Sequence, residues 1–154
     1  LYPGTGSMHE IGRGSGHSKT INIPLPPLSG DGVYANACES IIWPAARAFA
    51  PQLILVSAGF DGHWMDPLAQ MSLSLRGYDH LSRELIRMAK ELCQGRIVFM
   101  LEGGYDLEVV SGGVSNLARA LLGTDGPVDD LGASRRQEPD VSGLIQAIQQ
   151  LHAP

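Results

Sequence analysis

An aspartate in the loop that follows an apolar run has the position of a metal-binding carboxylate. Residues 53–56 are apolar, and Ser-Ala-Gly-Phe separates them from Asp61. The run predicts a buried strand, and open parallel sheets collect their chemistry at the carboxyl ends of the strands. A carboxylate there has the right oxygen ligands for a divalent metal ion. The alternative is a turn aspartate that bonds nearby backbone amides, and the residues by themselves favour that alternative.

A second apolar run, at residues 97–101, leads into Glu-Gly-Gly and then Tyr105. Gly103 and Gly104 allow a tight turn and a close approach of substrate to the backbone. The phenol of Tyr105 can donate a hydrogen bond, although a tyrosine packed at the start of a helix with its hydroxyl in solvent would look the same. If the two runs are neighbouring parallel strands, Asp61 and Tyr105 meet at one edge of the sheet.

The hydrophobic pattern predicts the elements that hold these loops. Apolar spacing predicts helices at 31–50, 75–92, 107–122 and 141–151, a buried strand at 52–58 and a second strand at 96–101. Residues 20–25 predict a short strand or an extended segment, and 1–19 and 123–139 predict loops. The alternation of helix and strand predicts an α/β fold with a parallel sheet flanked by helices.

Proline and glycine residues are expected to bend, end or weaken three of these helices. Pro44 predicts a kink in the first helix, Gly95 ends the second, and Gly112-Gly113 weakens the middle of the third.

Composition narrows the class of protein. The 154 residues are 44% hydrophobic, which predicts one globular domain or most of one. The net charge of -5, with scattered charges, argues against direct binding of nucleic acid. No apolar stretch approaches the roughly 20 residues that cross a membrane. Cys38 and Cys93 form no Cys-x-x-Cys pair and predict buried thiols in a reducing compartment. We therefore expect a cytoplasmic protein, or a nuclear one in a eukaryote.

Six short motifs occur in a specific order. They are Leu-Tyr-Pro-Gly-Thr-Gly at 1–6, Gly-Arg-Gly-Ser-Gly at 12–16, Asn-Ile-Pro-Leu at 22–25, Ser-Ala-Gly-Phe-Asp at 57–61, Asp-Pro-Leu at 66–68 and Leu-Glu-Gly-Gly-Tyr at 101–105. In these motifs the chain resembles the zinc-dependent histone deacetylase family, which includes acetylpolyamine amidohydrolases. The resemblance covers nearly the whole chain and implies a three-layer arginase-like α/β fold.

The resemblance assigns roles to the two strand-end residues. It implies that Asp61 is one of three protein ligands of a catalytic Zn²⁺, and it leaves open whether Fe²⁺ replaces Zn²⁺ and whether a structural monovalent cation binds upstream. It implies that Tyr105 donates a hydrogen bond to the acetyl carbonyl and to the tetrahedral oxyanion. The five histidines show no helical pairing that would predict a second metal site. His63, two residues after Asp61, is a weaker candidate for the rim of the site.

The resemblance also implies a substrate tunnel. Tyr2 and Leu68 match positions that line the narrow acyl-lysine tunnel of the family, and Gly103 and Gly104 belong to the same substrate-binding surface. Simple packing is the alternative for Tyr2 and Leu68. A leucine at position 68 is similar to the peptide deacetylases, whereas an acidic residue would indicate a cationic polyamine. We interpret Asp66 as a turn residue.

One departure from the family pattern sets the expected function of this chain. The paired histidines and the Asp-x-His ligands of the family lie upstream of Leu1, and nothing in the chain replaces them. We therefore expect residues 1–154 to be the C-terminal portion of a single deacetylase catalytic domain. The complete protein is expected to remove acetyl groups from ε-N-acetyl-lysine in proteins or peptides, and the isolated fragment is expected to be inactive.

Two alternatives stay open. One is deacetylation of acetylpolyamines or other acetylated small amines. The other is a non-catalytic fragment that self-associates or pairs with its missing N-terminal half, since a sheet cut partway exposes a strand edge and apolar surface.

Overall fold

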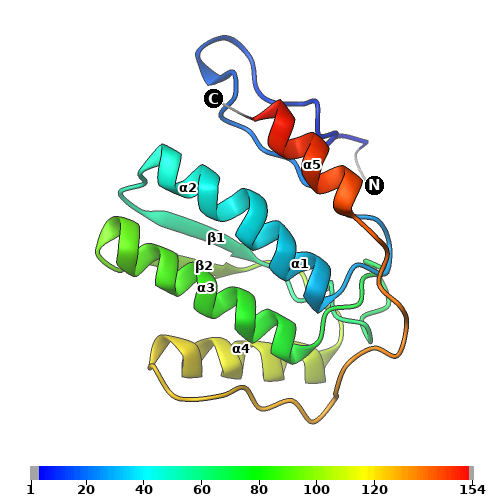
Figure 1. Cartoon of the computed structure of the whole chain (residues 1–154). Helices are drawn as coiled ribbons and strands as arrows, with labels where there is room; N and C mark the ends of the chain where they lie inside the picture. Colours follow the sequence, from blue (N-terminus) through cyan, green and yellow to red (C-terminus); the bar gives the residue numbers. More distant parts are fainter. Residues whose placement is uncertain (1–3, 153–154) are drawn as a thin grey trace.

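Two parallel strands form the sheet in the computed structural model, which describes residues 4–152. Strand β1 (Ile54–Ala58) pairs with β2 (Ile97–Leu101) in a register that runs from Ile54 opposite Ile97 to Ala58 opposite Leu101. Helix α3 (Leu75–Cys93) connects them, and both strands lie behind the helices in Figure 1. The parallel arrangement is confirmed, and the two strand ends lie at the same level.

The helix predicted at 31–50 is a continuous run of three segments. They are α1 (Asp31–Ala37), the π-helical η2 (Cys38–Ile42) and α2 (Trp43–Phe49). Pro44 lacks the N–H that a regular α-helix would bond to the carbonyl of Ser40. The disturbance expected at Pro44 therefore coincides with a π segment, whose wider turn uses a different bonding pattern.

Helix α3 begins and ends where the sequence predicts. The Ser74 hydroxyl caps the helix by accepting a hydrogen bond from the Gly77 N–H at 3.1 Å. At the other end Gln94 and Gly95 take left-handed conformations, with φ of 57° and 77°.

Helix α4 (Leu107–Leu121) is unbroken at Gly112 and Gly113, contrary to the predicted weakening. A Cβ on Gly112 would lie 2.7 Å from a methyl carbon of Leu75, and a Cβ on Gly113 would overlap the Phe60 ring. The two glycines therefore let α3 and the β1 loop approach α4 closely, and the packing offsets their low helix propensity.

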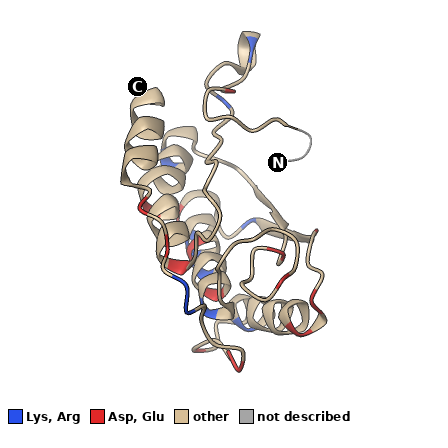
Figure 2. Ribbon diagram, turned by 90° about the vertical axis from the view of Figure 1, so that its right-hand side faces the viewer, with Lys and Arg blue, Asp and Glu red and all other residues tan. Residues whose placement is uncertain are grey.

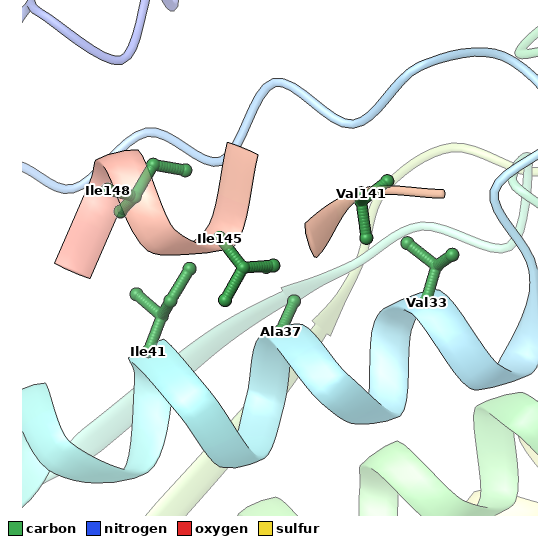
Figure 3. Close-up of a cluster of buried hydrophobic side chains, with 6 residues drawn as sticks. All are labelled: Val33, Ala37, Ile41, Val141, Ile145 and Ile148. Atoms are coloured by element: carbon green, nitrogen blue, oxygen red, sulfur yellow. The ribbon is translucent and has the colours of Figure 1, made fainter. Parts of the chain in front are cut away.

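Helix α5 (Ser142–Leu151) packs on α1 and η2 through one apolar cluster. Figure 3 shows the side chains of Val33, Ala37 and Ile41 facing Val141, Ile145 and Ile148. The segment 20–25 forms no strand, so that alternative was wrong. Instead its side chains at 21, 23 and 25 pack against the same cluster, which accounts for the alternating pattern.

The prediction that the first strand is buried is wrong for one of its faces, and the second strand shares that open face. Ile54 packs among the helices, but Leu55, Val98 and Met100 are 61%, 45% and 44% exposed. Successive side chains of a strand point to opposite faces, and within residues 4–152 the helices cover only one of them. The described chain therefore carries an open apolar sheet face.

Charge and hydropathy give no sign of a special surface in the described residues. Figure 2 shows acidic and basic residues interspersed along the helices and loops. None of the described helices is both long enough and apolar enough to cross a membrane.

Candidate active site

The loop after β1 and the turn after β2 are joined by backbone hydrogen bonds. The N–H of Glu102 donates to the carbonyl of Ala58 at 3.1 Å, and the N–H of Phe60 donates to the carbonyl of Gly103 at 2.8 Å. These bonds continue the pairing of the strands past their last paired residues. They place the segment that carries Asp61 directly beside the segment that carries Tyr105.

The Asp61 carboxylate lies against two glycines. A Cβ built on Gly103 would lie 2.8 Å from Asp61 Oδ2, and one built on Gly59 would lie 2.8 Å from Oδ1. A side chain at either position would displace the carboxylate. From the sequence we expected Gly103 to let the substrate approach the backbone closely. In the structure the group that approaches Gly103 closely is the Asp61 carboxylate.

Gly104 is required by its backbone conformation. Its φ is 142°, a region that favours glycine, and a Cβ there would lie 2.6 Å from a methyl carbon of Val110. A residue with a side chain at this position would therefore strain the turn that leads into Tyr105.

Tyr105 stands at the exit of this turn, immediately before α4. Asp106 caps that helix by accepting hydrogen bonds from the N–H groups of Glu108 and Val109. The Tyr105 side chain is 61% exposed, and Leu68 is equally exposed. Both side chains are therefore open to a ligand. Tyr2, the other predicted tunnel residue, lies outside the described residues.

Asp66 makes a contact that sequence reasoning missed. It does form the expected turn, because Oδ1 accepts a hydrogen bond from the Leu68 N–H at 3.0 Å. Its other oxygen, Oδ2, accepts a hydrogen bond from the Tyr105 N–H at 2.7 Å, across 39 residues of sequence. The side chain is buried, with 6% exposure. One carboxylate therefore joins the predicted tunnel residue to the predicted hydrogen-bond donor.

His63 is fully buried, so the weaker candidate for the rim of the site does not lie there. Its Nδ1 accepts a hydrogen bond from the Met65 N–H at 3.2 Å, which leaves the proton on Nε2. Burial lowers the pKa of the ring below its ordinary value, and the nearby carboxylates oppose that shift only in part. The neutral imidazole is part of the support under the Asp61 loop.

Two partly buried phenols also lie near Asp61, and the sequence offered no signal for either. Burial raises the pKa of Tyr34 and of Tyr78, and the negative charge of Asp61 contributes to both shifts. The Tyr78 ring packs on Phe60 with 5.0 Å between ring centroids. Both hydroxyls stay protonated at neutral pH and form part of the floor beneath the site.

The described residues do not by themselves fit a resident zinc ion. A catalytic Zn²⁺ takes three protein ligands, and Asp61 supplies one carboxylate. Residues 4–152 contain no group of three or more His, Cys, Asp or Glu side chains that could hold a metal ion. Further ligands would have to come from residues outside this set.

The strand order and the site together define an α/β protein whose candidate site lies at the carboxyl edge of a parallel sheet. Residues 1–121 match the family model for the histone deacetylase domain. The chain belongs to the histone deacetylase family.

Individual relatives agree with this assignment. The chain is 50% identical over 124 residues to "Histone deacetylase 14, chloroplastic" of Arabidopsis thaliana, covering 80% of this chain and 29% of that protein. It is 47% identical over 108 residues to a "Probable deacetylase" of Archaeoglobus fulgidus, covering 70% of this chain and 30% of that protein. The chain thus spans less than a third of these curated relatives.

Solved structures show the same fold. The crystal structure of the HDA15 HD domain matches 99% of this chain and 39% of its own, with a TM-score of 0.82 and 29% identity. The structure of the histone deacetylase Clr3 matches 99% of this chain and 25% of its own, with a TM-score of 0.84 and 31% identity. The α/β fold is therefore the arginase-like fold of histone deacetylase domains.

Proposed function

We propose that the complete protein removes acetyl groups from ε-N-acetyl-lysine in proteins or peptides, and that residues 1–154 are the C-terminal portion of its catalytic domain. The observation that carries this proposal is the position of the Asp61 carboxylate against Gly103, in the turn that delivers Tyr105. An amide hydrolase needs the ligands of its metal ion and the donor to its oxyanion close enough together to act on the same carbonyl group. The family assignment supports the same reaction class.

Each of the two strand-end residues has one proposed role. Asp61 is one ligand of a divalent metal ion, Zn²⁺ or Fe²⁺, whose other ligands lie outside these residues. That ion would act as a Lewis acid when bound. The Tyr105 hydroxyl donates a hydrogen bond to the acetyl oxygen as negative charge develops there. Its exposure supports this role, because the phenol is free to meet a substrate.

We favour an acyl-lysine over an acetylpolyamine because of Leu68. Its exposed apolar side chain suits the methylene stem of a lysine and offers no charge to a cationic polyamine. Comparing kcat/KM of the complete protein for an acetyl-lysine peptide and for an acetylated polyamine tests this choice. A higher kcat/KM for the polyamine would favour the alternative substrate.

The metal role is tested by Asp61→Ala in the complete protein. Removal of one of three ligands should reduce the zinc content of the purified protein to well below one ion per molecule and abolish deacetylation. Metal analysis and the melting temperature are measured together. Asp140→Ala, which removes a carboxylate at the start of α5, is the matched control and should keep its zinc. Full zinc occupancy in a folded Asp61→Ala protein would make Asp61 a turn residue.

A non-catalytic assembly fragment is the second candidate function. It is favoured by the open sheet face at Leu55, Val98 and Met100, which would be covered by a second copy or by the missing N-terminal half. Metal analysis of the purified chain separates the two candidates, because Asp61 alone holds zinc weakly and stoichiometric zinc would require ligands from another chain.

A further inference from the structure

The Gly103-Gly104-Tyr105 turn is tied down at both of its ends. The first tie is the hydrogen bond from the Phe60 N–H to the carbonyl of Gly103, at 2.8 Å. The second is the hydrogen bond from the Tyr105 N–H to Asp66 Oδ2, at 2.7 Å. Between them lies Gly104, which has the greatest backbone freedom of any residue type. The position of Tyr105 along this path therefore depends on the second tie.

Asp66 is itself carried by a braced loop. Its backbone N–H donates to the carbonyl of His63 at 2.9 Å, and that histidine is fully buried. On either side of His63, the Trp64 N–H donates to the Leu73 carbonyl at 3.0 Å and the Leu73 N–H donates to the Gly62 carbonyl at 3.1 Å. The same short loop begins at Asp61. The Asp66 carboxylate is thus held at a fixed place relative to the Asp61 carboxylate.

A carboxylate suits this position because it accepts two hydrogen bonds in two directions. Oδ2 receives the Tyr105 N–H and Oδ1 receives the Leu68 N–H, so neither buried oxygen is left without a partner. An ionised acceptor also gives shorter and stronger bonds than a neutral one. The burial of Asp66 protects both bonds from competition with water.

We propose that Asp66 is a positioning residue for the deacetylase reaction, which fixes the backbone of Tyr105 and thereby aims its hydroxyl at the oxyanion. The proposal rests on the proposed function of Tyr105. The proposed role requires no contact of Asp66 with substrate or metal, because Asp66 acts through the Tyr105 backbone. Its effect should therefore exist only while the phenol hydroxyl is present.

The test is a double-mutant cycle on the complete protein, with Asp66→Ala and Tyr105→Phe. Asp66→Ala alone should lower kcat by about 10- to 100-fold, because a small misplacement of a catalytic group has effects of this size. In the Tyr105→Phe background the same substitution should change kcat by less than about twofold, since no hydroxyl remains to be aimed. Zinc content should match the parent protein in every variant.

Two further variants complete the design. Asp129→Ala is the matched control, because Asp129 also accepts two backbone N–H bonds, from Arg76 at 3.3 Å and Gly132 at 2.8 Å, and it should leave kcat unchanged. Asp66→Asn keeps the shape and one good acceptor, so it should give an intermediate loss. If Asp66→Ala does not fold, Asp66→Asn takes its place in the cycle.

The outcomes separate the two proposals. An equal loss of kcat in both backgrounds, or no loss in either, would overturn the positioning role while a large effect of Tyr105→Phe leaves the proposed function standing. Near-normal kcat for Tyr105→Phe would instead remove Tyr105 from the mechanism and overturn both.

Discussion

At the scale of single residues, the candidate chemistry depends on backbone more than on neighbouring side chains. Gly59 and Gly103 leave the space that the Asp61 carboxylate fills. Tyr105 is held through its backbone N–H by Asp66, and its ring remains exposed. This arrangement leaves the functional ends of Asp61 and Tyr105 available to ligands while fixing the chain beneath them.

Replacing Tyr105 with phenylalanine in the complete protein deletes only a hydroxyl, so fold and metal content should be unaffected. We expect kcat to fall on the order of a hundredfold or more, with little change in KM, because the lost hydrogen bond is stronger in the transition state than in the ground state. Steady-state kinetics on an acetyl-lysine peptide measure both constants. The melting temperature and zinc content confirm that the variant is intact, and a normal kcat would make the tyrosine structural.

At the scale of elements, close packing decides features that local propensity alone does not. Helix α4 tolerates Gly112 and Gly113 because Leu75 and Phe60 occupy the space where side chains would be. The missing N–H of Pro44 leaves the Ser40 carbonyl free to accept a hydrogen bond from Gln149 Nε2 at 3.1 Å, and η2 contributes Cys38 to a cluster with Trp43 and Met88. Burial, with a smaller contribution from Glu84, raises the pKa of the Cys38 thiol to about 11.

This shift predicts a loss of stability at alkaline pH. The unfolded thiol ionises near its ordinary pKa of 9.0 and the folded one near 11, so between these values the unfolded chain binds fewer protons. The contribution of the Cys38 thiol to the free energy of unfolding should therefore be complete below about pH 9. It should be lost, by on the order of 2 to 3 kcal/mol, as the pH rises toward 11.

Cys38→Ala provides the reference, because it removes this contribution and keeps the other titrating groups. Urea unfolding of both proteins at pH 8 and at pH 10.5, under reducing conditions, gives the difference in unfolding free energy. The advantage of the parent protein over the variant in unfolding free energy should be smaller at pH 10.5 than at pH 8, because only the parent carries the Cys38 thiol. A difference independent of pH would show that the Cys38 thiol is not shielded from water.

At the scale of the whole molecule, the described chain is a sheet with helices on one face. Leu55, Val98 and Met100 lie open on the other face, where a three-layer α/β domain would have a second layer of helices. Burying this face would contribute roughly 25 cal/mol for each Å² of apolar surface removed from water. The face is therefore the natural contact for the proposed missing half.

We expect the purified 154-residue chain to release no acetate from an acetyl-lysine peptide, because Asp61 supplies only one of the three ligands that tight zinc binding requires. The same preparation should self-associate through the open face, and sedimentation analysis measures its mass. Val98→Lys should weaken that association, whereas Glu39→Lys, at an exposed site on η2, serves as the control. Zinc-dependent turnover by the isolated chain would contradict this prediction.

The sequence determined those features that depend on neighbouring residues. Hydrophobic period located α3, α4 and α5, and continuous apolar runs located both strands, because both patterns are local properties of the chain. The apolar runs before Asp61 and Tyr105 also located the two loops, since parallel strands bring their carboxyl ends to one edge. The family motifs then supplied the assignment.

Only the tertiary structure decided how distant residues meet. The bond from Tyr105 to Asp66 spans 39 residues, and no pattern within the Asp-Pro-Leu motif distinguishes it from an ordinary turn. The reason for a glycine at position 103 is likewise the Asp61 carboxylate from the other loop. Which face of the sheet is covered follows from helix packing, because an apolar run looks the same whether one face or both are buried.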